Sequence, residues 1–204
     1  MFSIGYATKP IETYIQQLHG HGVNVVADIR SVPYSRAFHD YNRETLQRKL
    51  QEAGIRYVYL GLELGPRSQD PQHYNDDNQV QFDRLMASSP FKAGIKRLFD
   101  GLDKGFTIAL SCAEKDPAIC HRSLLVGWFL RHQYQQELQH INHVGELESQ
   151  SALERRLLGL TNTQSDMLLS EVDALVLAYE RQCKACAYRL PNSLRLPNSL
   201  PNPQ

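Results

Sequence analysis

Short apolar runs alternate with amphipathic stretches over most of this chain, and this alternation is the strongest constraint on its fold. The apolar runs have the length and composition of strands and cover residues 2–4, 23–29, 57–60, 106–111 and 138–141. Apolar residues at helical spacing follow Pro10, Asn42 and Cys120, and two further helical stretches cover residues 80–87 and 90–103. Strands that alternate with helices favour a mainly parallel sheet with helices on both faces. The sequence therefore predicts an α/β, Rossmann-like fold.

The chain changes in character after residue 146. Residues 147–160 and 165–186 have the Leu-rich, charged composition of two helices. The six residues from Arg189, Arg-Leu-Pro-Asn-Ser-Leu, are repeated from Arg195, and Pro-Asn-Pro-Gln follows. Short proline-rich repeats cannot build a core. We therefore expect an α/β domain over residues 1–146, a helical extension packed on it over 147–188, and a disordered tail over 189–204.

Acidic and basic residues balance, with 22 Lys and Arg against 22 Asp and Glu, so no net charge draws the chain to nucleic acid or to a membrane. The N-terminal residues lack the charged start and apolar core of a signal peptide. No window approaches the roughly 18 apolar residues of a membrane span. We therefore expect a cytoplasmic protein with no membrane partner, whose four cysteines are reduced. The oligomeric state is left open.

Polar side chains follow each predicted strand at its carboxyl end. They are Tyr6 after the first strand, then Asp28, Arg30, Ser31 and Ser35, then Arg67 in a long polar loop over residues 61–78, and finally Cys112, Glu114, Cys120, His121 and Arg122. The carboxyl ends of parallel strands lie at one edge of a sheet, and ligands of such folds bind in the crevice outside that edge. We expect these side chains to converge on one site.

The same residues carry a resemblance. Gly5-Tyr6, Asp28-Ile-Arg-Ser-x-Pro-x-Ser35, Leu64-Gly-x-Arg67 and Cys112-Ala-Glu-Lys-Asp-Pro-x-x-Cys-His-Arg122 resemble an uncharacterised bacterial family, the domain of unknown function 488, over about residues 1–143. The resemblance implies an α/β fold and a shared pocket but no established reaction. Its recurrent positions in this numbering are Asp28, Arg30, Ser31, Arg67, Cys112, Glu114, Cys120, His121 and Arg122.

The arginines indicate an anion site. His121 and Arg122 fall in the opening turn of the helix after Cys120, where free N–H groups and a guanidinium favour phosphate or carboxylate. Arg30 and Arg67 would make the crevice locally basic, and Tyr6, Ser31 and Ser35 would add hydrogen-bonding groups. The alternative is that Arg122 pairs with Glu114 or Asp28 and braces the loops.

The thiols indicate a reactive centre. Cys120, beside His121 and Arg122, has surroundings that lower a thiol pKa and make a nucleophile, and Cys112 is a second choice. Asp28 and Glu114 are the carboxyl groups available for proton transfer, although Asp28 is equally suited to orient Arg30 or His121. The alternative is that both cysteines are buried core residues, as free cysteines commonly are.

A zinc site is a third hypothesis for the cysteines. Cys112, Cys120 and His121 form a loose triplet, and Cys183 and Cys186 have the spacing of a ligand pair. The separation of Cys112 from Cys120 is not a usual finger spacing, and Cys183 and Cys186 continue an apolar helix stripe through Val172, Val176 and Tyr179. The sequence therefore predicts no metal and no cofactor.

Two functions remain open at this stage. One is an enzyme that uses the Cys/His/Arg cluster on a phosphate-bearing small molecule or nucleotide. The other is a module that binds a nucleotide or nucleic acid without turnover. Aromatic residues for stacking on a base are present in the loops, at Tyr6, Tyr34, Phe38, Tyr41 and Tyr74. Whether the protein is an enzyme is not decided by the sequence.

Overall fold

The computed structural model of the protein describes residues 1–163 and 169–191. These residues form a six-stranded sheet with the strand order β3-β2-β4-β1-β5-β6. The strands are β1 (Phe2–Gly5), β2 (Val25–Asp28), β3 (Arg56–Tyr59), β4 (Ile108–Cys112), β5 (Gln139–Ile141) and β6 (Leu147–Ser149). The first five strands are parallel, and β6 runs antiparallel to β5. The predicted α/β fold with a mainly parallel sheet is confirmed.

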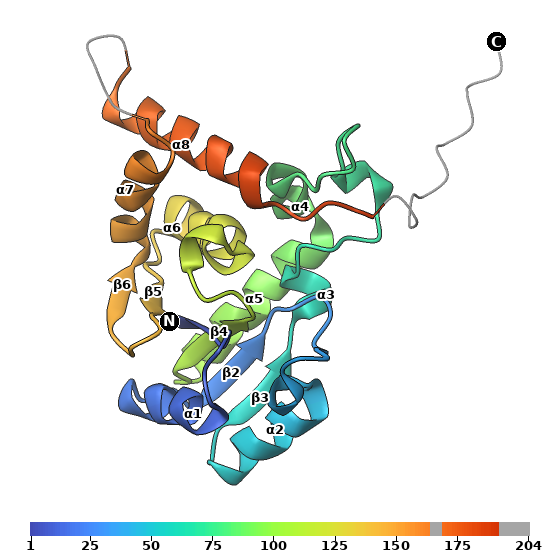
Figure 1. Ribbon diagram of the computed structural model, residues 1–204, viewed down its shortest axis with the longest axis vertical. Coiled ribbons are helices and arrows are strands. Elements are labelled where there is room, and N and C mark those ends of the chain that lie inside the picture. The colour runs from blue at the N-terminus through green and yellow to red at the C-terminus, as the bar shows by residue number, and fades with distance from the viewer. Residues whose placement is uncertain (164–168, 192–204) are drawn as a thin grey trace, which may run out of the picture.

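The helices are α1 (Ile11–Gly20), α2 (Arg43–Glu52), α3 (Gly61–Leu64), α4 (Phe82–Ala87), α5 (Ser89–Asp103), the π-helix η4 (Arg122–Gly127), α6 (Trp128–Tyr134), α7 (Gln150–Leu160) and α8 (Glu171–Cys186). Figure 1 shows α1 and α2 on one side of the sheet and α6, α7 and α8 on the other. Two cores follow from this arrangement, one on each face of the sheet.

Residue alternation along β4 supplies both cores. Ala109 belongs to the core beneath α1 and α2, whereas Ile108, Leu110 and Cys112 belong to the core beneath α5 to α8. Side chains of a strand point alternately to its two faces, so every second residue must be apolar on each side. All five residues of β4 are buried, and the one polar residue, Ser111, accepts a hydrogen bond from the hydroxyl of Tyr14 in α1 at 2.8 Å.

The strand order places a crevice at the end of β4. The segments after β1 and β2 form α1 and α2 on one face, whereas the segment after β4 forms η4 and α6 on the other. Where the connections after two neighbouring strands run to opposite faces of a sheet, a crevice forms at the carboxyl ends of those strands. Ligands bind in such crevices in open α/β sheets. The narrower term Rossmann-like is not confirmed, because β4 lies between β1 and β2 instead of beyond β1.

Several local predictions differ from the structure. Residues 147–149, expected to begin a helix, form β6, because they pair with the edge strand β5 before Ser149 caps α7. The loop over 61–78 contains the short helix α3 and a 3₁₀ turn, Pro71–His73. Asn42 holds the N-cap position of α2, but its side chain accepts a hydrogen bond from Ser35 instead of capping the helix.

The extension after residue 146 contributes to the same core as the sheet. Leu153 and Leu157 of α7 and Ala178 of α8 belong to the cluster that contains Leu110. The division into residues 1–146 and 147–188 stays a prediction, and residues 192–204 of the predicted tail lie outside the described residues. No helix within the described ranges is both long and apolar enough to span a bilayer.

Candidate functional site

The loop after β4 is held against the end of β1. The amides of Tyr6 and Ala7 donate to the carbonyls of Cys112 and Ala113 at 3.1 and 2.9 Å. The approach is so close that a Cβ atom on Gly5 would lie 1.9 Å from the carbonyl oxygen of Glu114. Only glycine fits here, and the close approach turns Glu114 back towards the end of β4.

Arginines fix the rest of this loop. Arg122 donates to the carbonyl oxygens of Glu114 and Lys115 at 2.7 and 3.1 Å. Arg156 of α7 makes two hydrogen bonds to the carboxylate of Asp116 and holds the pKa of that carboxyl below its usual range. The loop therefore runs back to the carboxyl end of β4. Cys120 and His121 lie there, directly before η4 begins.

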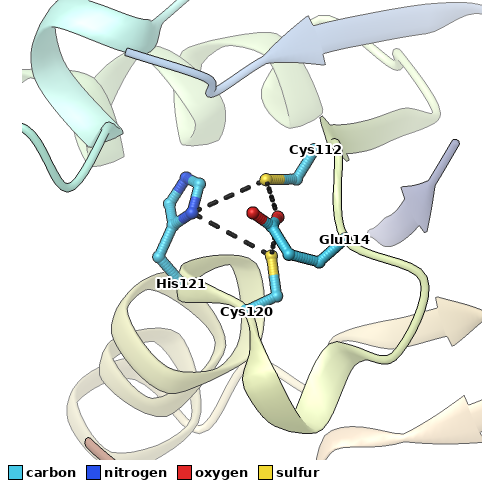
Figure 2. Close-up of side chains that lie close together, drawn as sticks. All are labelled: Cys112, Glu114, Cys120 and His121. Atoms are coloured by element: carbon cyan, nitrogen blue, oxygen red, sulfur yellow. Dashed lines mark hydrogen bonds between the residues drawn. The ribbon is translucent and has the colours of Figure 1, made fainter. Parts of the chain in front are cut away.

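Four chemically active side chains meet at this return, and we call them the thiol cluster: Cys112, Glu114, Cys120 and His121. Their potential ligand atoms all lie within 4.8 Å of one another. The Oε2 atom of Glu114 lies 2.7 Å from the sulfur of Cys112 and 3.0 Å from that of Cys120. Figure 2 shows this carboxylate beside both sulfur atoms, with the imidazole of His121 also facing them.

The imidazole of His121 is oriented by the backbone of β2's end. Its Nε2 atom lies 2.9 Å from the carbonyl oxygen of Ile29, which can only accept a hydrogen bond, so Nε2 carries a proton. Nδ1 then faces the sulfur atoms of Cys112 and Cys120 at 3.6 and 3.9 Å. Burial works against a charge on this ring, but the contacts with Cys120 and Glu114 raise the pKa of His121 overall.

The two thiols differ in acidity. Burial, reinforced by Cys120, raises the pKa of Cys112. Burial also works against a thiolate at Cys120, but the hydrogen bond from Cys112 and the positive charges of Arg122 and His121 lower the pKa of Cys120 overall. Burial and the nearby Cys120 raise the pKa of Glu114. Of the two thiols, Cys120 is therefore the more acidic one.

A cavity of about 390 Å³ opens above the thiol cluster. Its lining includes eight of the residues predicted from the sequence: Tyr6, Arg30, Ser31, Ser35, Arg67, Cys112, Glu114 and His121. They come from the ends of β1, β2, β3 and β4, so the structure brings these segments together at one edge of the sheet. Cys120, Asp28 and Arg122 do not line this cavity.

Asp28 is fully buried and holds Arg30 in place. The carboxylate of Asp28 accepts hydrogen bonds from Nε and Nη2 of Arg30 at 2.9 and 2.6 Å and from the hydroxyl of Tyr57 at 2.8 Å. Nη1 of Arg30 donates to the hydroxyl of Tyr6. Asp28 therefore orients Arg30 and does not reach the cavity for proton transfer, and the charge of Arg30 is already paired.

Arg122 is also turned inward. Its side chain has no exposed surface, and its terminal nitrogens are used on the loop carbonyls. The amides at the start of η4 are used as well, since those of Ser123 and Leu124 donate to the carbonyl of Cys120. Among these groups only Nε of Arg122 lacks a hydrogen-bond partner within the described residues, and this buried atom does not line the cavity in which we expect an anion. Arg122 instead braces the loop, through main-chain carbonyls and not through a carboxylate.

Arg67 is the exposed cation of the cavity. Its guanidinium lies 4.8 Å from the ring centre of Tyr188, and its amide donates to the hydroxyl of Ser31. Tyr188 and Cys186 also line the cavity, and neither was predicted. The amide of Val80 donates to the carbonyl of Tyr188, which fixes this residue beside the cavity after α8 ends. The sequence offers only a lone aromatic residue between a helix and a proline-rich repeat as a signal.

The remaining predicted hydroxyls stabilise loops. Ser35 accepts hydrogen bonds from the amides of Ala37 and Phe38 at 3.2 Å. The rings of Tyr6 and Tyr41 are stacked, with their centres 4.1 Å apart, in the core beneath α1 and α2. Tyr34 and Phe38 line the cavity, whereas Tyr41 and Tyr74 do not.

The site combines two chemical elements, a cationic rim at Arg67 and the thiol cluster at the floor. Thiols serve as nucleophiles, carboxyl and imidazole groups exchange protons, and all three bind metals. Cys112 is the thiol that reaches the cavity, whereas the more acidic Cys120 lies behind it.

The family model described as domain of unknown function DUF488 matches residues 10–129 of the chain. The matched range contains the thiol cluster and Arg67. No curated protein and no solved structure matches the chain.

Proposed function

This chain belongs to the DUF488 family, and on the geometry of its cavity we propose that it is an enzyme acting on a small phosphate-bearing molecule or nucleotide. The observation that carries the proposal is the position of Arg67, an exposed cation on the same cavity whose floor is the thiol cluster.

Arg67 is the group that would hold the anion. Within residues 1–163 and 169–191 it has no carboxylate partner, unlike Arg30, whose guanidinium is paired with Asp28. A guanidinium that is stacked on a ring keeps its N–H groups free at its edge for two parallel hydrogen bonds to a phosphate. The contact with Tyr188 therefore orders Arg67 without neutralising it.

Aromatic side chains on the cavity wall would accept a flat group. Tyr34, Phe38 and Tyr188 line the cavity together with Arg67, and the Tyr34 side chain is 53% exposed. Stacking of a base on an aromatic ring is worth about 1–3 kcal/mol. A nucleotide would place its phosphate at Arg67 and its base against one of these rings.

The first experiment measures binding by titration calorimetry with AMP, ribose 5-phosphate and inorganic phosphate. We expect AMP to bind more tightly than ribose 5-phosphate, and Arg67→Ala to weaken AMP about 10- to 100-fold, as loss of a charge-assisted contact predicts. Arg48→Ala, which removes an exposed α2 cation that does not line the cavity, is the charge-matched control. Unchanged AMP affinity in Arg67→Ala, or no binding of AMP and phosphate at millimolar concentration, contradicts the proposal.

The second experiment separates an enzyme from a binding module. The same phosphate-bearing probes are incubated with the protein and followed by phosphorus NMR. An enzyme consumes one of them, and Glu114→Gln should stop this conversion while AMP still binds. The module is the second candidate, favoured by the exposed ring of Tyr34 at the cavity wall. Binding that depends on Arg67 with every probe left intact would establish the module and refute the enzyme.

A further inference from the structure

We infer that the thiol cluster is a binding site for one transition metal ion of the zinc class, held by Cys112, Cys120, His121 and Glu114. This inference goes beyond the anion-binding proposal and does not depend on it, because it rests on the geometry within the thiol cluster.

The donor atoms are spaced as metal ligands are. Zinc bonds of about 2.3 Å to sulfur and 2.0–2.1 Å to nitrogen put tetrahedral ligand atoms about 3.5–3.8 Å apart. Nδ1 of His121 lies 3.6 and 3.9 Å from the two sulfur atoms. Oε2 of Glu114 lies closer to them, at 2.7 and 3.0 Å, where it accepts the thiol protons that a metal ion would displace to solvent.

The second shell matches that of a metal-bound histidine. A ligating imidazole usually donates its other N–H to a carbonyl or carboxylate, which fixes the ring and presents the second nitrogen to the metal. His121 meets this requirement through Ile29, whose carbonyl accepts from Nε2 at 2.9 Å. The sulfur of Cys120 in turn accepts a contact from the amide of Arg122 at 3.5 Å.

The surrounding charges fit a bound dication. Two thiolates and the Glu114 carboxylate carry three negative charges, which a dication and one guanidinium would balance. Arg122 supplies the guanidinium: it is fully buried, it donates to the main-chain carbonyl of Glu114, and within the described residues it pairs with no carboxylate. A charge buried in this way is costly unless opposite charge lies close by.

The ligand types select the metal. Thiolate and imidazole ligands favour zinc over magnesium or calcium, which prefer oxygen. Cys112, Glu114 and His121 line the cavity, whereas Cys120 closes the thiol cluster from behind. A metal ion here would lie at the cavity floor, with these four ligands completing a tetrahedral shell. Within the described residues, no other group of three such ligands meets this closely.

The test uses the full chain without any phosphate ligand. Protein loaded with zinc and passed through a desalting column should retain one zinc per chain. X-ray absorption should show two sulfur atoms at about 2.3 Å and two lighter atoms at about 2.0–2.1 Å. Cobalt in place of zinc should give thiolate-to-metal charge-transfer bands. No retained zinc, or a zinc shell without sulfur, would overturn the inference even if no variant folds.

Variants then locate the ion. Cys120→Ser should weaken zinc by more than the 10- to 100-fold typical of a lost second-shell partner. The matched control is Cys183→Ala with Cys186→Ala, which removes the other two thiols and should retain zinc. Loss of zinc in this control, with retention in a folded Cys120→Ser, would place the ion in α8 and refute the site. Because these assays contain no phosphate ligand, their failure leaves the Arg67 experiment standing, and the reverse holds.

Discussion

Arg122 is the largest side chain that the structure fully buries, and its role at the residue scale is to hold the loop after β4. We predict that Arg122→Ala lowers the free energy of unfolding by about 3–6 kcal/mol, because two charge-assisted hydrogen bonds to carbonyls are lost and each is worth about 1.5–3 kcal/mol. Urea denaturation followed by circular dichroism measures the change.

Arg67→Ala is the comparison for this prediction. Arg67 is exposed, and a surface substitution usually changes stability by less than about 0.5 kcal/mol. We therefore expect the two arginines to separate, with Arg122 affecting stability and Arg67 affecting AMP affinity. An Arg122→Ala protein as stable as the wild type but unable to bind AMP would show that Arg122 contacts the anion after all.

The position of a site residue in the fold could be predicted from the sequence where it depends only on the end of a strand. Cys112 ends β4 and Tyr6 follows β1, so both lie at the expected edge of the sheet. The roles of Asp28 and Arg122 were harder to predict, because each side chain bonds to a partner inside the protein. The sequence does not show which of several neighbours a charged group will contact. Tyr188 was missed because its position depends on contacts with Val80, far away along the chain.

At the element scale, the close packing of β1 against the β4 loop depends on Gly5. A methyl group there would lie 1.9 Å from the carbonyl oxygen of Glu114 and 3.0 Å from Nη1 of Arg122. We predict that Gly5→Ala costs about 1–3 kcal/mol of stability, as overpacking usually does, and displaces Glu114 from the thiol cluster. Thermal unfolding with and without zinc measures both effects.

Gly20→Ala is the matched control at the end of α1. A Cβ atom at Gly20 would meet nothing within 4 Å, so this variant should lose no stability. Equal melting temperatures for Gly5→Ala and the wild type would mean that the loop does not pack as described.

Helix and strand boundaries were predictable where one face is clearly apolar, as in α1 and α5. The pattern holds only in part for α8: Tyr179, Cys183 and Cys186 pack against the core as expected, whereas Val172 is 71% exposed and the buried positions are Ala174, Ala178 and Gln182. Small residues allow α8 to approach its neighbours closely, and a search for large apolar residues overlooks Ala174 and Ala178. The π-helix after Cys120 has no sequence signal, although such turns are frequent at functional sites.

At the scale of the whole molecule, the alternation of elements predicts parallel strands but not their order. Placement of β4 between β1 and β2 depends on which faces the helices cover, which is settled only by packing. The residues of the thiol cluster likewise come together only through the packing of the folded chain. The sequence spacing of Cys112 and Cys120 differs from that of zinc fingers, and it does not show that the loop brings Glu114 into contact with both sulfur atoms.

His140 joins distant parts of the chain in the interior. From β5, its Nδ1 lies 2.6 Å from the hydroxyl of Ser3 in β1, and its Nε2 lies 2.8 Å from Oε1 of Gln150 in α7. The amide oxygen can only accept, so Nε2 carries the proton and Nδ1 accepts from Ser3. Burial, helped by the charge of Arg122, lowers the pKa of His140 to about 3. The ring is therefore neutral in the folded protein near pH 7.

This neutral histidine should make the protein less stable in mild acid. Unfolded chains bind a proton at His140 below about pH 6.5 and the folded protein does not, so its contribution is complete above that pH and declines as the pH falls towards 3. Between pH 7 and pH 5 the loss from this one group is about 2 kcal/mol. In His140→Gln the fall in unfolding free energy over this range should be smaller by that amount, even if the variant is less stable at pH 7. His19→Gln, at an exposed position in α1, is the control and should show the same fall in unfolding free energy as the wild type. An equal fall in all three proteins would show that protonation of His140 does not destabilise the folded protein.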